Sequence, residues 1–268
     1  MRPIKVFVKL GGSFITDKSV QGSLNGPRIV SAARMMRKAL DHAARRGRPI
    51  RLVLGHGGGS YGHILAKKYG AVAGAHPEYG WEGLYKIRES MARMNLLFVQ
   101  HCGKGGLFPV TVSPFAVAEA VDGVVRRLDV HNIQALLELG QVPLLHGDVI
   151  PDSKRGFTIA STEALLEALS RRIRFDRIVM VSDTDGVLGR DGATIPRISG
   201  GNIKRLAGIL AGSGSPDVTG GMRKKVEKLS ALVRGGRAGS ARILRCAKDA
   251  KNLCEAILGT GGGGTLFS

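Results

Sequence analysis

The stretch "LVLGHGGGSYGH" (residues 52–63) runs from an apolar, strand-like segment into a turn dense in glycine. It matches three short motifs that belong to different chemistries. Residues 57–62 spell the G-x-G-x-x-G of a dinucleotide-binding turn. Residues 58–62 spell the G-x-S-x-G of a hydrolase nucleophile elbow, and residues 56–59 an esterase-like HGGG. All three motifs share a strand, a glycine turn and a helix start, where backbone N–H groups can meet an anion.

Two of the three chemistries fit the surrounding sequence poorly. In a hydrolase the oxyanion donors face the serine from a separate segment, whereas here both hydrolase motifs use the same residues, so Ser60 is not expected to be a nucleophile. A dinucleotide-binding fold needs an acid at the end of a second strand about 20 residues further on. Glu78 lies at that distance, but its surroundings, AVAGAHPEYGW, make a poor strand.

Apolar β-rich runs alternate with helical patterns along the chain. The expected strands cover residues 4–10, 50–55, 108–112, 142–147, 177–182 and 241–245, with "TLFS" as a last strand. The expected helices cover residues 27–46, 84–102, 131–140, 161–172, 201–211, 220–234 and 247–257. Residues 147–161 and 185–198 are predicted to form hairpins or lids. The pattern predicts one α/β domain over residues 1–268, a three-layer αβα sandwich with a mainly parallel sheet and β-hairpin lids.

The composition, with 43% hydrophobic and 23% charged residues, is that of an ordinary globular protein. Without a membrane-length apolar run or a signal peptide, we expect a cytoplasmic protein with no membrane partner. The three cysteines lack zinc spacing, so no metal site is expected from them. The net charge of +19 could suit nucleic acid, but the cations are scattered and aromatic residues make up only 5%. We therefore expect no nucleic-acid partner, and a basic field that attracts small polyanions.

Two further glycine turns join the first one. "VKLGGSFITDK" (residues 8–18) is again strand, glycines and hydroxyl groups, and "DVTGGMRKKVE" (residues 217–227) places glycines before a lysine-rich helix. A parallel sheet brings such loops to one edge, where ligands bind in this fold class. Several anion-binding loops at one edge suggest a ligand with several phosphates. The P-loop pattern G-x-x-x-x-G-K-[ST] does not occur in the sequence.

In this order, VKLGGSFITDK, HGGGSYGH, GQVPLLHGDVIPD, SDTDGV and DVTGGMRKKVE resemble the amino-acid-kinase superfamily, most closely its archaeal-type isopentenyl phosphate kinases, which are related to fosfomycin kinase. The likeness extends from about Val8 to the final GGGGTLFS. It implies the amino-acid-kinase fold, with acceptor binding in about residues 1–150 and nucleotide binding in about residues 151–268. It also implies a Mg²⁺- and ATP-dependent phosphotransferase that converts isopentenyl phosphate to isopentenyl diphosphate in isoprenoid biosynthesis. A homodimer is expected.

The resemblance implies a role for each matching residue, because phosphoryl transfer depends on positioning and on neutralising charge. The implied catalytic residues are Lys9, Lys18, His63 and Lys225. The implied ATP-binding residues are Lys9, Gly11, Gly12, Ser13, Gly59, Asp183, Gly221 and Lys225. The implied acceptor-binding residues are Gly58, His63 and Thr162. In this scheme Lys18 sits over the transferred group, Lys225 clamps the β/γ side of ATP, and His63 orients the acceptor phosphate. No protein ligand for a metal ion is implied.

One segment departs from the family pattern. Where relatives carry Ser-Gly-Asp followed by another acid, this chain has Ser161, Thr162, Glu163 and Ala164, so a side chain replaces a glycine beside the acceptor. The first alternative is therefore a kinase for another small phosphate or phosphonate acceptor. The second is a non-catalytic nucleotide- or nucleic-acid-binding protein on the same fold.

The resemblance also implies that the acceptor tail lies against the helix that follows the histidine turn. There Ile87, Met91 and Met94 share one helical face, which forms either core or the wall of a pocket.

Overall fold

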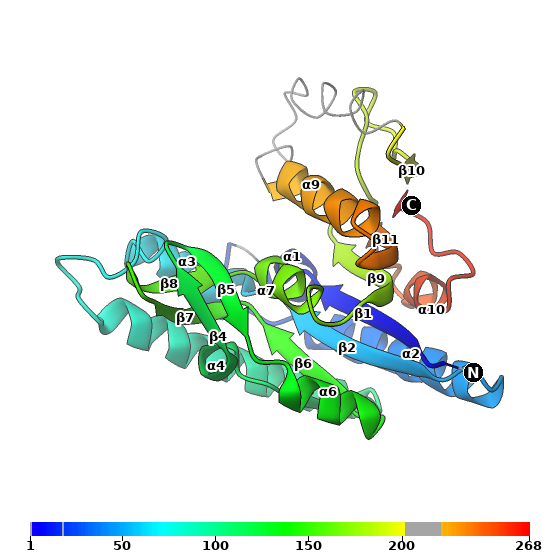
Figure 1. The fold of residues 1–268 in the computed structure, drawn as a ribbon, viewed down its shortest axis with the longest axis horizontal. Helices are drawn as coiled ribbons and strands as arrows, with labels where there is room; N and C mark the ends of the chain where they lie inside the picture. Colours follow the sequence, from blue (N-terminus) through cyan, green and yellow to red (C-terminus); the bar gives the residue numbers. More distant parts are fainter. Residues whose placement is uncertain (1, 18, 202–220) are drawn as a thin grey trace.

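The computed structural model describes residues 2–17, 19–201 and 221–268, and Figure 1 shows its ribbon. Lys18 lies outside these ranges, as does the helix expected at residues 201–211 apart from its first residue. No helix within the described ranges is both long enough and apolar enough to cross a membrane.

The large sheet of the described structure has the strand order β10-β12-β11-β9-β1-β2-β6-β3. Its strands are β1 Ile4–Leu10, β2 Ile50–His56, β3 Pro109–Thr111, β6 Val142–His146, β9 Phe175–Ser182, β10 Arg197–Ile198, β11 Ala238–Arg245 and β12 Thr265–Phe267. Neighbouring strands are parallel, except that β12 runs antiparallel to β11. The predicted mainly parallel sheet and the predicted last strand are confirmed.

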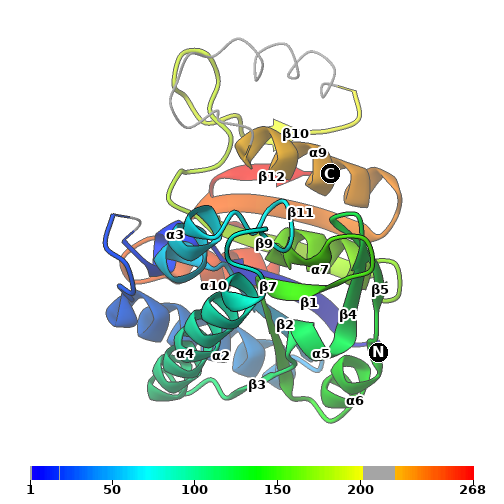
Figure 2. The same cartoon turned by 90° about the vertical axis from the view of Figure 1, so that its left-hand side faces the viewer.

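Helices cover both faces of the large sheet, as Figure 2 shows. Side chains alternate between the faces along a strand, so Val6 and Val8 of β1 enter one core while Phe7 enters the other. The first core is completed by α2 Gly26–Arg45, α3 Gly59–Lys68, α4 Glu82–Lys104 and α10 Lys251–Leu258. The second is completed by α6 His131–Glu138, α7 Thr162–Leu169 and α9 Gly221–Arg234. Two single-turn helices, α1 Gly12–Ile15 and α5 Pro114–Val117, lie in connections.

A small sheet with the order β5-β4-β7-β8 lies beside the large one. Its strands are β4 Ala118–Val121, β5 Val124–Leu128, β7 Asp148–Asp152 and β8 Gly156–Ala160. The β7–β8 pair is the hairpin predicted at residues 147–161. The β4–β5 hairpin was not predicted; both turn residues, Asp122 and Gly123, have positive φ angles of 52° and 79°, as a type I′ turn requires. In the second predicted hairpin, residues 185–198, Leu188 and Thr194 form an antiparallel bridge.

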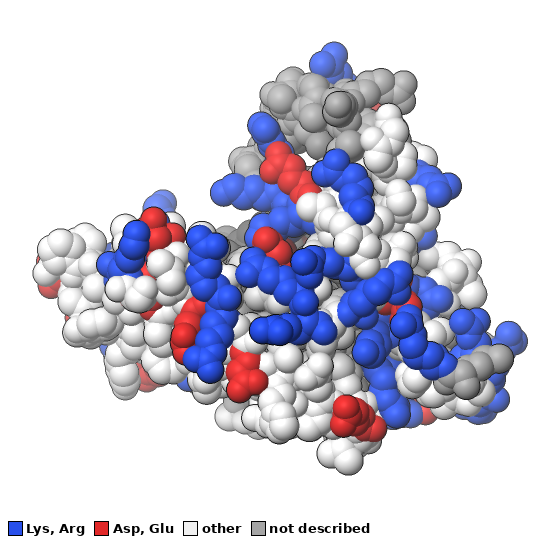
Figure 3. Space-filling view, viewed as in Figure 1, with Lys and Arg blue, Asp and Glu red and all other residues white. Residues whose placement is uncertain are grey.

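Positive charge is spread over much of the surface. On the face drawn in Figure 3, Lys and Arg lie across the middle and the right-hand side, with Asp and Glu interspersed among them. Some of these cations are paired with acids, as in Arg2–Asp176 at 3.1 Å and Arg155–Asp122 at 2.8 Å.

Candidate active site

A cavity of about 310 Å³ lies at the carboxyl ends of β1, β2, β6 and β9. Ligands bind at this edge in parallel α/β sheets because the loops that follow the strands converge there. The cavity brings together most of the predicted site residues, namely Lys9, Gly11, Gly12, Ser13, Gly58, Gly59, His63, Thr162, Gly221 and Lys225. Segments far apart in the sequence therefore meet at one place.

Two glycine turns form one wall of the cavity, packed backbone against backbone. A Cβ on Gly12 would lie 2.6 Å from the nitrogen of Gly59, and a Cβ on Gly57 would lie 2.8 Å from the nitrogen of Gly12. Gly59 also has a φ of +49°, and a Cβ there would strike Thr16 Oγ1 at 2.3 Å. Only glycine allows the turns after β1 and β2 to approach this closely, so their backbone amides lie side by side.

Lys9 extends from β1 into the cavity and pairs with Glu163 in the first turn of α7. Its Nζ lies 2.5 Å from Glu163 Oε1, and the two side chains are 9% and 16% exposed. Burial lowers the pKa of Lys9, whereas the Glu163 carboxylate raises it. Burial raises the pKa of Glu163, but the charge and hydrogen bond of Lys9 outweigh burial and hold that pKa below its usual value. Glu163 is therefore charged, and it was not among the predicted site residues.

A second lysine borders the same space. Lys225 on α9 lowers the pKa of both Lys9 and Glu163 through its charge, which places the three groups in one electrostatic cluster. Gly221, at the start of α9, also lines the cavity. The cluster has more positive than negative charge, which suits a bound polyanion.

The other end of the cavity is apolar, with walls of Ala66, Ile87, Met91 and Ile159. His63 of α3 lies at this end beside them. Ile87 and Met91 of the α4 face line the cavity, whereas Met94 is not part of its lining and is fully buried in the core. The face is therefore partly core and partly pocket wall.

Thr162 is buried at the start of α7. Its Oγ1 donates a hydrogen bond of 2.6 Å to the carbonyl of His56. Its methyl group packs on Gly55, where a Cβ would lie 2.8 Å from Thr162 Cγ2. Thr162, the residue that departs from the family pattern, is thus hydrogen-bonded to β2 and packed against it.

Asp183 lies apart from the other predicted residues. It follows β9 and lines a second cavity of about 740 Å³, which also includes Arg28, Arg245 and Lys248. Ser182 lines both cavities, so the second one begins where the first one ends. Asp183 accepts a hydrogen bond of 3.2 Å from the Ser182 hydroxyl.

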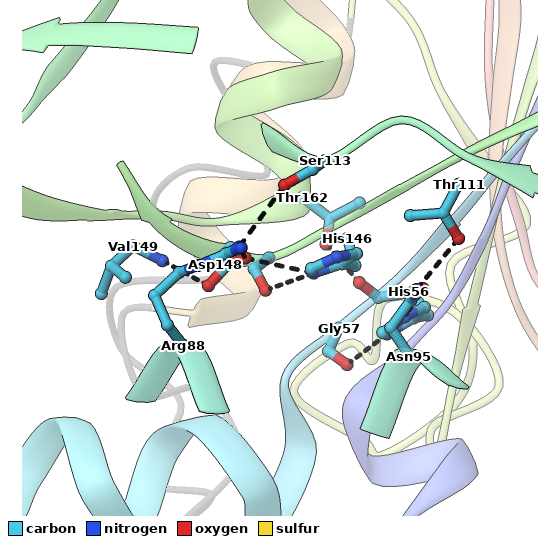
Figure 4. Close-up of polar contacts among 11 residues, drawn as sticks. His56, Gly57, Arg88, Asn95, Thr111, Ser113, His146, Asp148, Val149 and Thr162 are labelled. Carbon is cyan, nitrogen blue, oxygen red and sulfur yellow. Dashed lines mark hydrogen bonds and ion pairs between the residues drawn. The ribbon is translucent and has the colours of Figure 1, made fainter. Parts of the chain in front are cut away.

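Figure 4 shows a polar cluster beside the cavity that the sequence did not reveal. His56 and His146 end the paired strands β2 and β6, and their rings stack with centroids 5.1 Å apart. Burial lowers the pKa of His56 to about 4 and that of His146 to about 3, so both rings are neutral. Asp148, which lines the cavity, accepts a hydrogen bond from Arg88. Burial raises the pKa of Asp148 to about 6, although Arg88 opposes this shift.

Known proteins with similar sequences include several isopentenyl phosphate kinases and, at lower coverage, acetylglutamate kinases. The model of the amino acid kinase family matches residues 5–245. The isopentenyl phosphate kinase of Methanocaldococcus jannaschii is 32% identical over 254 residues, which cover 94% of each chain. That of Haloferax volcanii is 36% identical over 228 residues, which cover 85% of this chain and 88% of the relative. A solved structure of an isopentenyl phosphate kinase matches with a TM-score of 0.79 at 24% identity, covering 98% of this chain and 99% of the other.

Proposed function

Because the chain belongs to the amino acid kinase family and, within it, to the isopentenyl phosphate kinases, we propose that it transfers the γ-phosphoryl group of ATP to isopentenyl phosphate, giving isopentenyl diphosphate and ADP. One observation carries the proposal most directly. A single cavity joins two glycine turns, the buried Lys9 and the half-buried Lys225 to an apolar wall with a histidine beside it. Such a cavity suits an acceptor that has a phosphate head and a short hydrocarbon tail.

The nucleotide phosphates occupy the end near the glycine turns. Gly12 and Gly59 donate backbone N–H groups there, and the Ser13 hydroxyl adds another donor. The N–H of Gly11 is bonded to the carbonyl of Val181 at 2.9 Å, so Gly11 serves by holding the turn beside β9. Lys9 and Lys225 neutralise the charge on the β- and γ-phosphates, which grows on the oxygens during transfer. Gly221 lets the start of α9 approach the phosphates. Asp183, which follows β9, contributes to binding the nucleotide. Lys18 lies outside the described residues; the proposal assigns it the charge on the transferred group.

The acceptor phosphate binds between Gly58 and His63, with Thr162 nearby. A phosphate monoester has its second pKa near 6 and is therefore largely a dianion at neutral pH. Its oxygen attacks the γ-phosphorus, the bond from that phosphorus to the β–γ bridging oxygen breaks, and ADP leaves. No general base is needed, so His63 acts by donating a hydrogen bond that orients the acceptor. The tail lies along Ile87, Met91 and Ile159.

Bound together with ATP, Mg²⁺ neutralises charge on the β- and γ-phosphates. Within the described ranges there is no group of three or more His, Cys, Asp or Glu side chains that could hold a metal ion. Glu163, the acid within the electrostatic cluster, is engaged by Lys9. The described residues would suit an ion that is brought in with the nucleotide and that would supply charge neutralisation there.

The proposal divides the chain by function. Residues 1–150 supply the acceptor end through α3 and α4, and residues 151–268 supply the nucleotide end through β9 and α9. Three parts cross this division, because the transferred group lies between the two ends: the turn after β1, Gly59 and Thr162.

A homodimer is also proposed, formed through the β3 end of the large sheet. β3 is an edge strand, and exposed apolar side chains lie on and beside it. We call this group the β3-edge patch; it consists of Leu96, Phe108 and Val110, which are 59%, 71% and 42% exposed. Exposed edge strands and apolar patches are commonly covered in native proteins. A second copy of the chain, placed on the patch, buries these side chains.

A coupled assay of ATP consumption over a panel of small phosphorylated alcohols tests the function, with the products identified by mass spectrometry. Isopentenyl phosphate is expected to be converted to its diphosphate in a Mg²⁺-dependent reaction. Folded protein that ignores isopentenyl phosphate and phosphorylates another member of the panel refutes the assigned acceptor. Folded protein that consumes no ATP with any member refutes the kinase function itself.

A further inference from the structure

The polar cluster in Figure 4 bears on how the phosphate-binding turn is held. We propose that His56 is a positioning residue for phosphoryl transfer, whose imidazole holds the carbonyl of Gly57 and thereby aims the next backbone amide into the cavity. The inference rests on the proposed kinase function and assigns a role to a residue outside the cavity lining.

The backbone around His56 is tied to three neighbouring elements. Its carbonyl accepts hydrogen bonds from Thr162 Oγ1 at 2.6 Å and from the nitrogen of Gly147 at 3.2 Å. The nitrogen of Gly57 donates to the carbonyl of Leu10 at 3.1 Å. The end of β2 is thus fixed to α7, β6 and β1. The next backbone group along the chain, the carbonyl of Gly57, then sets the direction of the turn.

The imidazole of His56 supplies that orientation. Its Nδ1 lies 3.1 Å from the carbonyl oxygen of Gly57, which accepts and never donates, so Nδ1 carries the proton. A neutral ring has only one N–H, so Nε2, 3.2 Å from the Asn95 amide, must accept. Asn95 is placed with its Oδ1 toward Nε2 and with its Nδ2 donating to Thr111 Oγ1 at 2.9 Å. Because amide oxygen and nitrogen are assigned from the surrounding hydrogen bonds, the single N–H of the ring calls for the opposite orientation, with Nδ2 donating to Nε2 and Oδ1 accepting from the Thr111 hydroxyl. In that orientation every group in the chain Thr111–Asn95–His56–Gly57 has a matching partner.

The same device recurs on the neighbouring strand. His146 Nδ1 lies 3.1 Å from the carbonyl of Gly147, the residue that follows it. The two rings stack at an interplanar angle of 12° because His56 and His146 are register partners in the parallel pair of β2 and β6. Stacking fixes the plane of the His56 ring, and with it the direction of its N–H.

The geometry of a trans peptide transmits this direction to the cavity. The carbonyl of Gly57 and the N–H of Gly58 belong to one planar peptide group and point in opposite directions. No cis peptide bond occurs among the described residues. With its carbonyl held by His56, this peptide turns the Gly58 N–H to the other side, and Gly58 lines the cavity where the acceptor phosphate binds in the proposed function.

The test compares His56→Leu and His56→Asn with the wild-type enzyme. Leu removes the donor, whereas the amide of Asn places an N–H close to the position of Nδ1. His56→Leu is expected to lower kcat/KM for isopentenyl phosphate by about 10²-fold, the scale of a small misplacement at a reacting centre, while the KM for ATP changes little. His56→Asn is expected to restore most of this loss. The control is His101→Leu, because His101 also donates from Nδ1 to a carbonyl, that of Leu97 at 2.7 Å, away from the cavity.

Melting temperatures separate positioning from folding. If His56 is merely structural, the Leu and Asn variants lose stability but keep wild-type kinetics per folded molecule, and this result overturns the inference. Equal kinetic losses in both variants also overturn it. Absence of wild-type turnover refutes the proposed function instead. In that case calorimetry with inorganic phosphate replaces the kinetic comparison: weaker binding only in His56→Leu supports the inference, and equal affinities contradict it.

Discussion

Replacing Glu163 by Gln tests the electrostatic cluster at the centre of the cavity. The substitution keeps the size of the side chain but leaves Lys9 buried beside Lys225 without its counter-charge. Removing one partner of a buried ion pair costs about 3 to 5 kcal/mol. At roughly 2 to 4 °C per kcal/mol for a protein of this size, the melting temperature should fall by about 10 °C.

Activity should respond to pH as well. Burial already lowers the pKa of Lys9, and Glu163 is the group that opposes this effect. In Glu163→Gln the pKa of Lys9 falls further, so the amine loses its proton at a lower pH and no longer neutralises phosphate charge. The alkaline limb of the kcat/KM profile should therefore move to lower pH. Profiles measured from about pH 6 to 11 span the ordinary lysine pKa of about 10.4.

Glu167→Gln is the matched control on the same helix. Glu167 pairs with Lys228 at 2.9 Å, but its side chain is 44% exposed. Such surface pairs contribute at most about 1 kcal/mol. The reasoning on the cluster is refuted if Glu163→Gln and Glu167→Gln have the same melting temperature and the same alkaline limb.

The free energy of unfolding should fall as the pH is lowered from about 6.5 to 4, because unfolding lets His56 and His146 take up protons that their lowered pKa values exclude in the fold. Asp148, with its raised pKa, acts in the opposite sense, but it is one group against two. Denaturant midpoints that stay level over this pH range would contradict this expectation. Met91→Ala should improve turnover of longer prenyl phosphates relative to isopentenyl phosphate, whereas Met94→Ala should only destabilise, by roughly 2 to 5 kcal/mol; the substrate ratio and melting temperature of each variant decide. An aspartate within the β3-edge patch should convert a dimer to a monomer in light scattering, and an unchanged mass argues against this interface.

The parallel sheet could be predicted because its strands are buried on both faces and stand out as continuous apolar runs. The β4–β5 hairpin was missed because its strands are short and half exposed, with Glu119 and Arg127 paired on the surface. A signal was nevertheless present. The Asp122-Gly123 pair between alternating residues is a strong hairpin signal over a short range, since both positions tolerate a positive φ.

Within the candidate site, glycine turns and lysines were visible because their spacing within each turn is local. Glu163 was not identified as a site residue, because its partner Lys9 is 154 positions away and an acid in a first helical turn usually just favours the helix dipole. The pairing of His56 with His146 depends on β2 and β6 being neighbours in register, which no local pattern reveals. The one hint was that each histidine directly follows an apolar run and precedes a glycine.

The position of β12 has a consequence for folding of the chain during translation. This strand lies between β10 and β11, yet both of those are translated before it. As the chain leaves the ribosome, the edges of β10 and β11 that pair with β12 stay unpaired until β12 is released. Open strand edges are where nascent chains aggregate. Truncation before Thr265 would make that transient state permanent, so a premature stop there should yield insoluble protein although every residue of the candidate site has been made.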